Sequence, residues 1–236
     1  MIKDLLQNYI KDYKTTLTEN QYEQFQKYFE LLAEWNEKMN LTAITDESGV
    51  ALKHFADSLS LLNFVDIPQN SSLADVGTGA GFPGVVLKIA RPEIKLTLID
   101  SLNKRLVFLG EVCAQLGIKA ELIHSRAEDG ARDEKLRENF DFAVSRAVAR
   151  MNVLSEYCLP YVKVGGAFCA MKGAQANEEF KESLNAINTL GGKLENKYFF
   201  ELPENGGERA IAVVRKVKNT PQKYPRQSGK IKAKAL

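Results

Sequence analysis

Residues 71–84 read Ser-Ser-Leu-Ala-Asp-Val-Gly-Thr-Gly-Ala-Gly-Phe-Pro-Gly, and this stretch decides the fold. An apolar run leads into a glycine-rich turn, and Pro83 stands where a helix would begin, because its fixed φ suits the first helical turn. The pattern predicts a strand, a tight loop and a helix N-terminus. Gly77, Gly79 and Gly81 remove Cβ atoms and permit positive φ, so that backbone N–H groups can lie directly against a bound nucleotide. We therefore expect a small-molecule binding loop here.

Two acidic residues indicate which small molecule the loop binds. Three glycines of the turn spell G-x-G-x-x-G, which by itself also fits a dinucleotide. However, Asp75 lies two residues before the first glycine, where a carboxylate can hold the cationic amino group of a methionine moiety but would repel a pyrophosphate. Asp100 ends a second apolar strand and is placed to accept hydrogen bonds from ribose hydroxyls. These acids favour S-adenosylmethionine over NAD.

Length and composition are typical of a soluble globular protein. The 236 residues, 44% hydrophobic and 26% charged, suffice for one α/β domain and an appendage without disulfides or metals. No apolar run approaches the roughly 20 residues of a membrane span, and no signal-peptide core is evident, so we expect a cytoplasmic protein. Cys113, Cys158 and Cys169 are expected to be reduced core thiols. With only two histidines, His54 and His124, no metal site is expected.

The net charge of +2 hides an uneven distribution. Nine of the 32 basic residues follow Glu208 and no acidic residue does, which leaves residues 1–208 with 23 bases against 30 acids, a net charge of −7. An acidic body with a basic tail indicates contact with a polyanion, most simply a nucleic acid. A solvated, frayed terminus is the alternative. The nine are Arg209, Arg215, Lys216, Lys218, Lys223, Arg226, Lys230, Lys232 and Lys234.

Residues 1–70 are predicted to form an N-terminal helical extension. A short amphipathic helix is expected over 1–14, and Thr18 with Gln21 forms a capping box that starts a longer helix. The aromatic stripe of that helix is expected to be core rather than ligand contact. It comprises Tyr22, Phe25, Phe29, Leu32, Trp35 and Met39.

A third helix is expected over about 49–64. Its helical spacing places His54, Asp57 and Ser58 on one face, where they can hydrogen-bond locally. This cluster either supports the packing of the N-terminal helices or belongs to the mouth of the substrate site, and the sequence leaves both possibilities open.

From residue 71 onward, stretches with the hydrophobic period of a strand alternate with stretches that have the period of a helix, as a parallel α/β sheet requires. This alternation defines a domain over 71–218. Gly117 is expected to end a helix and Gly165-Gly166 to form a turn. The tail, 219–236, is not expected to be helical throughout, because it contains two prolines and a glycine. Strands are predicted over 72–77, 95–100, 119–124, 140–145 and 167–171, followed by an antiparallel pair over 195–201 and 209–217; helices are predicted over 83–91, 102–116, 149–161 and 176–190.

Further candidate cofactor-binding residues follow the third and fourth predicted strands. Ala127 and Glu128 come after the third strand, beside the loop, where an adenine base would rest, although Glu128 can equally be a charge near a helix N-terminus. Arg146 directly follows the fourth strand and faces the crevice in which open α/β sheets bind ligands.

Together these motifs resemble class I S-adenosylmethionine-dependent methyltransferases and, more narrowly, the RsmG (GidB) family. The resemblance implies a Rossmann-like, mostly parallel seven-stranded sheet with an N-terminal helical extension. It extends over nearly the whole chain, and departures are few: Lys53 stands where arginine is usual, and Ala80 where proline is frequent. The matching stretches are Trp35-Asn36, Asn40-Leu41-Thr42, residues 53–58 (Lys-His-Phe-Ala-Asp-Ser), Asp75 to Gly84, residues 98–101, Lys104-Arg105, Ser145-Arg146-Ala147, Met171-Lys172-Gly173, Gly207-Glu208-Arg209 and Tyr224-Pro225-Arg226.

The family resemblance implies a function and site residues. The family methylates guanine N7 in the 530-loop region of 16S ribosomal RNA, so the expected partner is 16S rRNA or the small ribosomal subunit, with a monomeric enzyme and no membrane. Its cofactor contacts fall on positions that match Gly77, Phe82, Ala127, Glu128 and Arg146, with Asp100 at the ribose. Asp75 and Gly79 complete the expected cofactor set.

Guanine N7 has a free lone pair, so neither a base nor a covalent nucleophile is expected. Consistent with this, Ser145-Arg146-Ala147 stands where amine methyltransferases carry Asn/Asp-Pro-Pro-Tyr. The expected catalytic residues are Arg146, which would orient the cofactor or the guanine, and Lys172 and His54, which would hold RNA phosphates together with the tail. The alternatives are an NAD-binding Rossmann oxidoreductase and a catalytically silent RNA-binding module.

Overall fold

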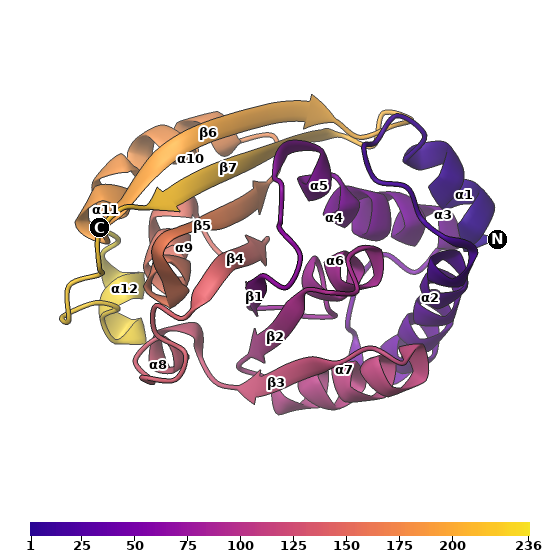
Figure 1. The fold of residues 1–236 in the computed structure, drawn as a ribbon, viewed down its shortest axis with the longest axis horizontal. Coiled ribbons are helices and arrows are strands. Elements are labelled where there is room, and N and C mark those ends of the chain that lie inside the picture. Colours follow the sequence, from indigo (N-terminus) through magenta and orange to yellow (C-terminus); the bar gives the residue numbers. More distant parts are fainter.

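A mostly parallel seven-stranded sheet forms the centre of the computed structural model, which describes residues 1–236 except for the side chain of Lys232. The strand order is β3-β2-β1-β4-β5-β7-β6 (Figure 1). The first five strands pair in parallel, and β7 runs antiparallel between β5 and β6, as the sequence predicts. The strands are β1 Ser72–Val76, β2 Lys95–Asp100, β3 Ala120–His124, β4 Phe140–Arg146, β5 Val162–Lys172, β6 Gly192–Glu201 and β7 Glu208–Lys216.

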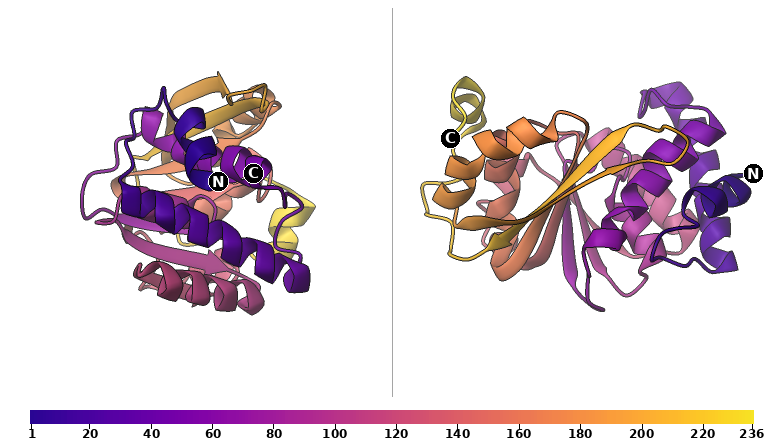
Figure 2. Two further views of the ribbon diagram at one scale, coloured as in Figure 1. Left: turned by 90° about the vertical axis from the view of Figure 1, so that its right-hand side faces the viewer. Right: turned by 90° about the horizontal axis from the view of Figure 1, so that it is seen from above.

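Helices cover both faces of the sheet, which gives three layers (Figure 2). One face packs against the N-terminal helices with α6 and α7, and the other packs against α9, α10 and α11. The helical segments are α1 Ile2–Tyr9, α2 Glu19–Met39, α3 Glu47–Val50, the π-helical η1 Ala51–Ala56, α4 Asp57–Leu59, α5 Leu61–Phe64, α6 Gly84–Ala90, α7 Asn103–Leu116, α8 Ala127–Gly130, α9 Met151–Cys158, the 3₁₀ turn η2 Leu159–Tyr161, α10 Ala176–Glu182, α11 Leu184–Thr189 and α12 Ser228–Ala233. The class I methyltransferase fold expected from the sequence is confirmed.

The N-terminal helices share one core with the sheet. The capping box of α2 is present, because the Thr18 side chain accepts from the Gln21 amide while the Gln21 side chain accepts from the Thr18 amide. Phe25 of α2 is fully buried. One turn further on, the Tyr28 hydroxyl donates to the carbonyl of Ala80, 2.5 Å away, and so ties α2 to the glycine-rich loop.

The glycine-rich loop and the flanking elements follow the prediction closely. Pro83 caps α6, which begins one residue later than expected, and Gly117 ends α7 in the left-handed conformation with φ of 64°. The three buried cysteines are free, as expected.

Two local predictions were wrong, and a third was confirmed in extent but missed a π-helical part. Gly165-Gly166 is not a turn: β5 already begins at Val162, and Gly165, with φ of 89°, lies where the pairing with β4 shifts register. The helix expected over 176–190 is interrupted at Ser183, whose hydroxyl donates to the carbonyl of Phe180, 2.9 Å away. The helix expected over 49–64 is a continuous helical segment from Glu47, but it widens into a π-helix at η1.

Candidate active site

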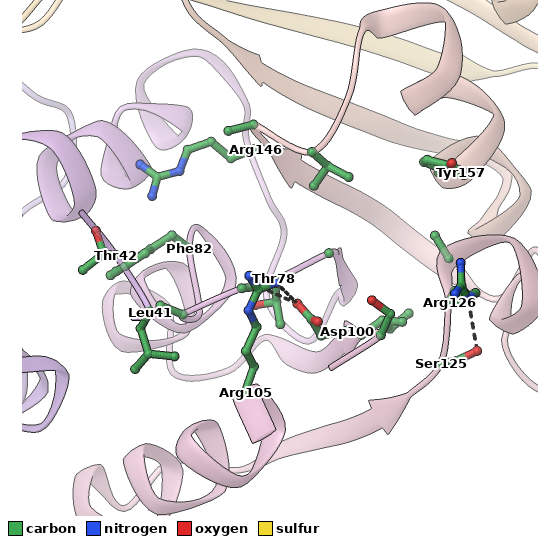
Figure 3. Close-up of a pocket in the computed structure, with 18 of the residues that line it drawn as sticks. Leu41, Thr42, Thr78, Phe82, Asp100, Arg105, Ser125, Arg126, Arg146 and Tyr157 are labelled. Carbon is green, nitrogen blue, oxygen red and sulfur yellow. Dashed lines mark hydrogen bonds and ion pairs between the residues drawn. The ribbon is translucent and has the colours of Figure 1, made fainter. Parts of the chain in front are cut away.

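A cavity of about 520 Å³ lies at the carboxyl ends of the parallel strands (Figure 3). The loop after β1 forms its floor, and residues that follow β2, β3 and β4 form its sides, as the topology of an open α/β sheet requires. The N-terminal segment and α12 also reach it. The lining residues used below are Thr42, His54, Gly77, Gly79, Phe82, Asp100, Arg105, Ala127, Glu128, Arg146, Ala147, Val148, Tyr157 and Ser228. We call this space the donor cavity.

Two glycines give the loop its shape. Gly77 has φ of 74°, and a Cβ there would come within 2.7 Å of a Val148 methyl group, so any side chain would clash. Gly79 has φ of 62° with no heavy atom within 4 Å of a Cβ position, so its backbone borders the open cavity. The loop is therefore a surface on which a ligand can rest directly against the backbone.

Asp75 lies behind the loop, and does not line the donor cavity. Its side chain is fully buried, and its Oδ2 accepts from the Thr78 hydroxyl and from the Gly84 amide, both at 2.8 Å. Burial raises the pKa of Asp75 to about 6. This placement does not support the expected direct contact with a methionine amino group. We propose instead that Asp75 holds the two ends of the loop together.

Asp100 lies at the edge of the donor cavity, where the sequence places it. The side chain is 2% exposed, and its Oδ2 accepts from the Gly79 amide at 2.9 Å. The Arg105 guanidinium, from the first turn of α7, donates to the same oxygen at 3.3 Å. The carboxylate thus joins the glycine loop to α7 at the position proposed for the ribose (Figure 3).

Ala127 and Glu128 begin α8 and line the same cavity as Asp100. Glu128 is 5% exposed, so its carboxylate belongs to the interior of the cavity rather than to a solvated helix end. The Tyr161 hydroxyl donates to the carbonyl of Ala127 at 2.8 Å and thereby fixes the start of α8. We propose this part of the cavity for the adenine.

Phe82, His54 and Arg146 form a stack that closes the other part of the cavity. The His54 ring is parallel to that of Phe82, with centroids 4.4 Å apart, and the Arg146 guanidinium carbon lies 5.1 Å from the Phe82 centroid. Three elements contribute to the stack, namely the loop, η1 and the end of β4. The sequence indicates each residue but not this arrangement.

Hydrogen bonds fix the charge state of the stack. Arg146 donates to Asp57 Oδ2 at 2.9 Å, to the Lys53 carbonyl at 2.8 Å and to His54 Nδ1 at 3.1 Å. His54 Nδ1 also lies 3.1 Å from the Lys53 carbonyl, and Nε2 lies 2.8 Å from the Thr42 hydroxyl. Because a guanidinium can only donate, the contact with Arg146 favours the tautomer in which Nδ1 accepts and Nε2 carries the proton. Burial, followed by the nearby Arg146 charge, lowers the pKa of His54 to about 3. His54 is therefore uncharged at neutral pH, which does not support the expected contact with RNA phosphates.

A second cavity of about 350 Å³ shares His54, Arg146 and Ala147 with the first. Ala147 has φ of 56°, a conformation that residues other than glycine rarely adopt and that often marks a functional site. The other lining residues include Ile44, Lys53, Asp57, Met171, Lys172, Phe200, Arg209 and Ile211. We call this space the acceptor cavity.

The charged groups of the acceptor cavity bind one another. Arg209 donates through Nε to Asp57 Oδ1 at 3.2 Å, so the two oxygens of that buried carboxylate serve two guanidinium groups. Lys172 donates to the Ala149 carbonyl and pairs with Glu179, both at 2.7 Å. Because this ammonium is 9% exposed and already satisfied, its position does not support the expected role as a phosphate contact.

These features fit S-adenosylmethionine. The cavity has a backbone cradle with a buried acid beside it, a second polar wall at α8 and an aromatic side that closes it. Together these parts suit a ligand with a charged methionine end, a ribose and an adenine. The fold and the site thus define a class I S-adenosylmethionine-dependent methyltransferase. Solved structures share the fold: a SAM-dependent methyltransferase from Aquifex aeolicus superposes with a TM-score of 0.55 at 18% identity, over 74% of this chain and 96% of that one. Fibrillarin from Methanococcus jannaschii does so with a TM-score of 0.52 at 16% identity, over 65% and 71%.

The family follows from closer relatives. The model of the GidB family, described as rRNA small subunit methyltransferase G, matches residues 21–205. A protein of Leuconostoc citreum named ribosomal RNA small subunit methyltransferase G is 54% identical, over 93% of each chain. One of Clostridium perfringens with the same name is 47% identical, over 99% of this chain and 98% of its own. The chain belongs to the rRNA small subunit methyltransferase G family, which confirms the resemblance found in the sequence and leaves the NAD-binding alternative without support.

Sequence reasoning did not single out several groups in the site. Arg105 appears only in a matching motif, although a basic residue just after an acid-tipped strand is a signal for it, and Arg209 appears only in a matching motif and among the basic residues after Glu208. Tyr157 and Ser228 had no signal, since they reach the donor cavity only through tertiary packing. Within the part of the chain that the structure describes, there is no cluster of metal-binding side chains and no helix long and apolar enough to cross a membrane.

Proposed function

We propose that this protein transfers the methyl group of S-adenosylmethionine to N7 of a guanine in 16S ribosomal RNA, in the 530-loop region. The observation that carries the proposal is the wall that the two cavities share. A donor in the first and a purine in the second would meet at His54, Arg146 and Ala147. Such an arrangement aligns two reactants inside one site, which accounts for much of the catalysis of a direct displacement.

The chemistry of the acceptor cavity supports a nitrogen that needs no deprotonation. Both Asp57 oxygens accept from arginines, His54 Nδ1 accepts from Arg146, and the Lys172 ammonium is bound. The carboxylate and the imidazole beside the shared wall are thus already occupied by hydrogen bonds. An exocyclic amine or a hydroxyl would require a base, whereas guanine N7 offers an in-plane lone pair at neutral pH. S-adenosylmethionine supplies an electrophilic methyl group on a positively charged sulfur.

The walls of the acceptor cavity suit a planar base. Phe200 offers an aromatic face for stacking, and the two arginines held by Asp57 present N–H groups. We propose that Arg146 and Arg209 orient the guanine through its acceptor atoms, and that Lys53, which is exposed at the rim, faces the RNA backbone. Because the substrate is ribosomal RNA, we propose that the protein acts in the cytoplasm, as a monomer, on rRNA or an assembling small subunit.

The test is methyl transfer from tritiated S-adenosylmethionine to 16S rRNA lacking the modification, both as naked RNA and as small subunits. Borohydride reduction and aniline cleavage, followed by primer extension, then locate N7-methylguanine. We expect incorporation at one guanine. Incorporation that aniline cannot reveal would show a different acceptor atom, and no incorporation into either substrate would favour the catalytically silent RNA-binding module.

A further inference from the structure

The basic C-terminal tail is folded onto the body of the protein. Arg137 donates to the carbonyls of Thr220 and Tyr224, at 2.8 and 2.9 Å, and the neighbouring Arg132 donates to the carbonyl of Pro225. Tyr224 is 8% exposed, and it packs into the core on the α9 side of the sheet. The tail therefore follows a defined path across this face, next to α8 and α9 (Figure 1).

Part of the positive charge expected to face RNA is paired with acidic side chains of the protein. Four of the eight basic side chains after Glu208 that the structure describes have acidic partners. These pairs are Arg209 with Asp57, Arg215 with Glu195, Lys216 with Glu138, and Arg226 with Glu156. Three of these pairs lie in β7, and the fourth, with Arg226, lies in the tail, so the stretch after Glu208 offers less charge to a polyanion than its sequence suggests.

The tail is anchored most firmly at Arg226. Its backbone amide and its Nε donate to Glu156 Oε1 at 2.7 and 2.9 Å, and its Nη2 donates to Oε2 at 2.6 Å. Glu156 has no exposed surface, and a carboxylate buried to that extent requires a partner of this kind. The pair therefore fixes this part of the tail against α9 in one position.

Both anchor residues have neighbours in the donor cavity. Tyr157 directly follows Glu156 on α9, and Ser228 comes two residues after Arg226; both line the cavity, as do Ala127 and Glu128. Beyond Ser228, α12 is held down by Ile231, which is fully buried. Ser228, in one wall of the donor cavity, thus lies about 145 residues after the glycine loop in the sequence, a separation that only tertiary packing closes.

We infer that the C-terminal tail is a structural part of the cofactor site: Ser228 and Tyr157 close the cavity beside α8, and the Glu156–Arg226 pair is a positioning pair that holds this wall in place. The inference rests on the assignment of the donor cavity to S-adenosylmethionine. It predicts that damage to the tail weakens cofactor binding before it weakens RNA binding, contrary to the role that charge alone suggests for the tail.

Two sets of variants of the full chain test the inference by calorimetry with S-adenosylhomocysteine. Ser228→Trp places bulk at the cavity wall without touching the anchor, and Lys230→Trp, an exposed site on the same helix outside the cavity, is its matched control. Arg226→Gln removes the anchor, and Arg226→Lys partly restores it. We expect Ser228→Trp and Arg226→Gln to raise the Kd at least about tenfold, the equivalent of about 1.4 kcal/mol, and Arg226→Lys to give an intermediate value.

Steady-state kinetics separate this role from general stability. In the affected variants, KM for S-adenosylmethionine should rise while KM for rRNA stays within about twofold of the parent. If Ser228→Trp binds S-adenosylhomocysteine like the parent, the inference is wrong, whether or not Arg226→Gln folds. An increase in KM for rRNA alone would also overturn it and return the tail to RNA binding. Neither result would affect the proposed methyl transfer, which is tested separately by the transfer assay with the parent protein.

Discussion

The carboxylate of Asp57 holds two arginines, one on each oxygen: Oδ2 lies 2.9 Å from Arg146 Nη1, and Oδ1 lies 3.2 Å from Arg209 Nε. The Asp57 side chain is 7% exposed, so the charge-assisted hydrogen bonds of its buried carboxylate have a strongly preferred geometry. One residue of the N-terminal helical segment thereby orients the ends of β4 and β7, which otherwise lie on opposite sides of β5.

Replacing Asp57 by Asn should impair catalysis more than cofactor binding. The amide removes the negative charge and one of the two acceptor oxygens, so the two guanidinium groups repel each other and lose their alignment. We expect kcat to fall by about 10- to 100-fold, the range seen when a catalytic group is misplaced by about 1 Å. The change is measured by steady-state methyl transfer to rRNA. Asp66→Asn, an exposed site at the end of the same helical segment, should leave kcat unchanged.

Arg146→Ala should reduce methyl transfer still further, because this residue lines both cavities and supports the stack on Phe82. We expect kcat/KM for rRNA to fall at least about 100-fold, the equivalent of about 2.7 kcal/mol. Arg150→Ala is the control, since that arginine is 63% exposed and pairs only with Glu182 at the surface. Parental activity in Arg146→Ala would refute the role assigned to the residue.

Two glycines with nearly the same backbone provide a matched test of the loop. Gly79 and Gly117 have φ of 62° and 64°, and a Cβ at either would meet nothing within 4 Å. Alanine should therefore cost each about 1 kcal/mol of stability through backbone strain. Only at Gly79 would the added methyl group enter the donor cavity. Calorimetry with S-adenosylhomocysteine should show weaker binding, by about tenfold or more, for Gly79→Ala alone. Equal affinities in the two variants would contradict the assignment of the loop.

His54 should make stability depend on pH in a defined direction. Its pKa is about 3 in the folded protein against 6.5 ordinarily, so between these values the unfolded chain takes up a proton that the native state refuses. The contribution of His54 to the free energy of unfolding is fully present above pH 6.5 and declines as the pH falls toward 3. Between about pH 7.5 and pH 5 this decline amounts to up to about 2 kcal/mol.

Urea unfolding of the parent and of His54→Gln at these two pH values measures this contribution. The stability advantage of the parent should shrink at the lower pH. Asp75, with its pKa raised to about 6, acts in the opposite direction but is common to both proteins, so it cancels in the comparison. A pH-independent difference between the parent and His54→Gln would contradict a neutral His54.

Local sequence patterns were sufficient to predict the sheet, the glycine loop and the family. These depend on local signals: apolar periods of two and 3.6 residues, a proline at a helix start, and glycines where side chains clash. The family motifs also led to the residues of the cavity, namely Gly77, Gly79, Phe82, Asp100, Glu128 and Arg146, all of which line it in the structure. Short-range spacing carries this information because the backbone of each element responds to its own residues.

The surroundings of Asp75, His54 and Lys172, in contrast, are set by contacts between different elements of the structure. Asp75 is buried behind the loop, His54 is uncharged beside Arg146, and Lys172 is paired with Glu179. Burial and the neighbours brought by other elements set the charge and the hydrogen bonding of a side chain, and neither is encoded in its local sequence. For the same reason the tail, which is basic along the sequence, is bound to Glu156 and becomes a wall of the donor cavity.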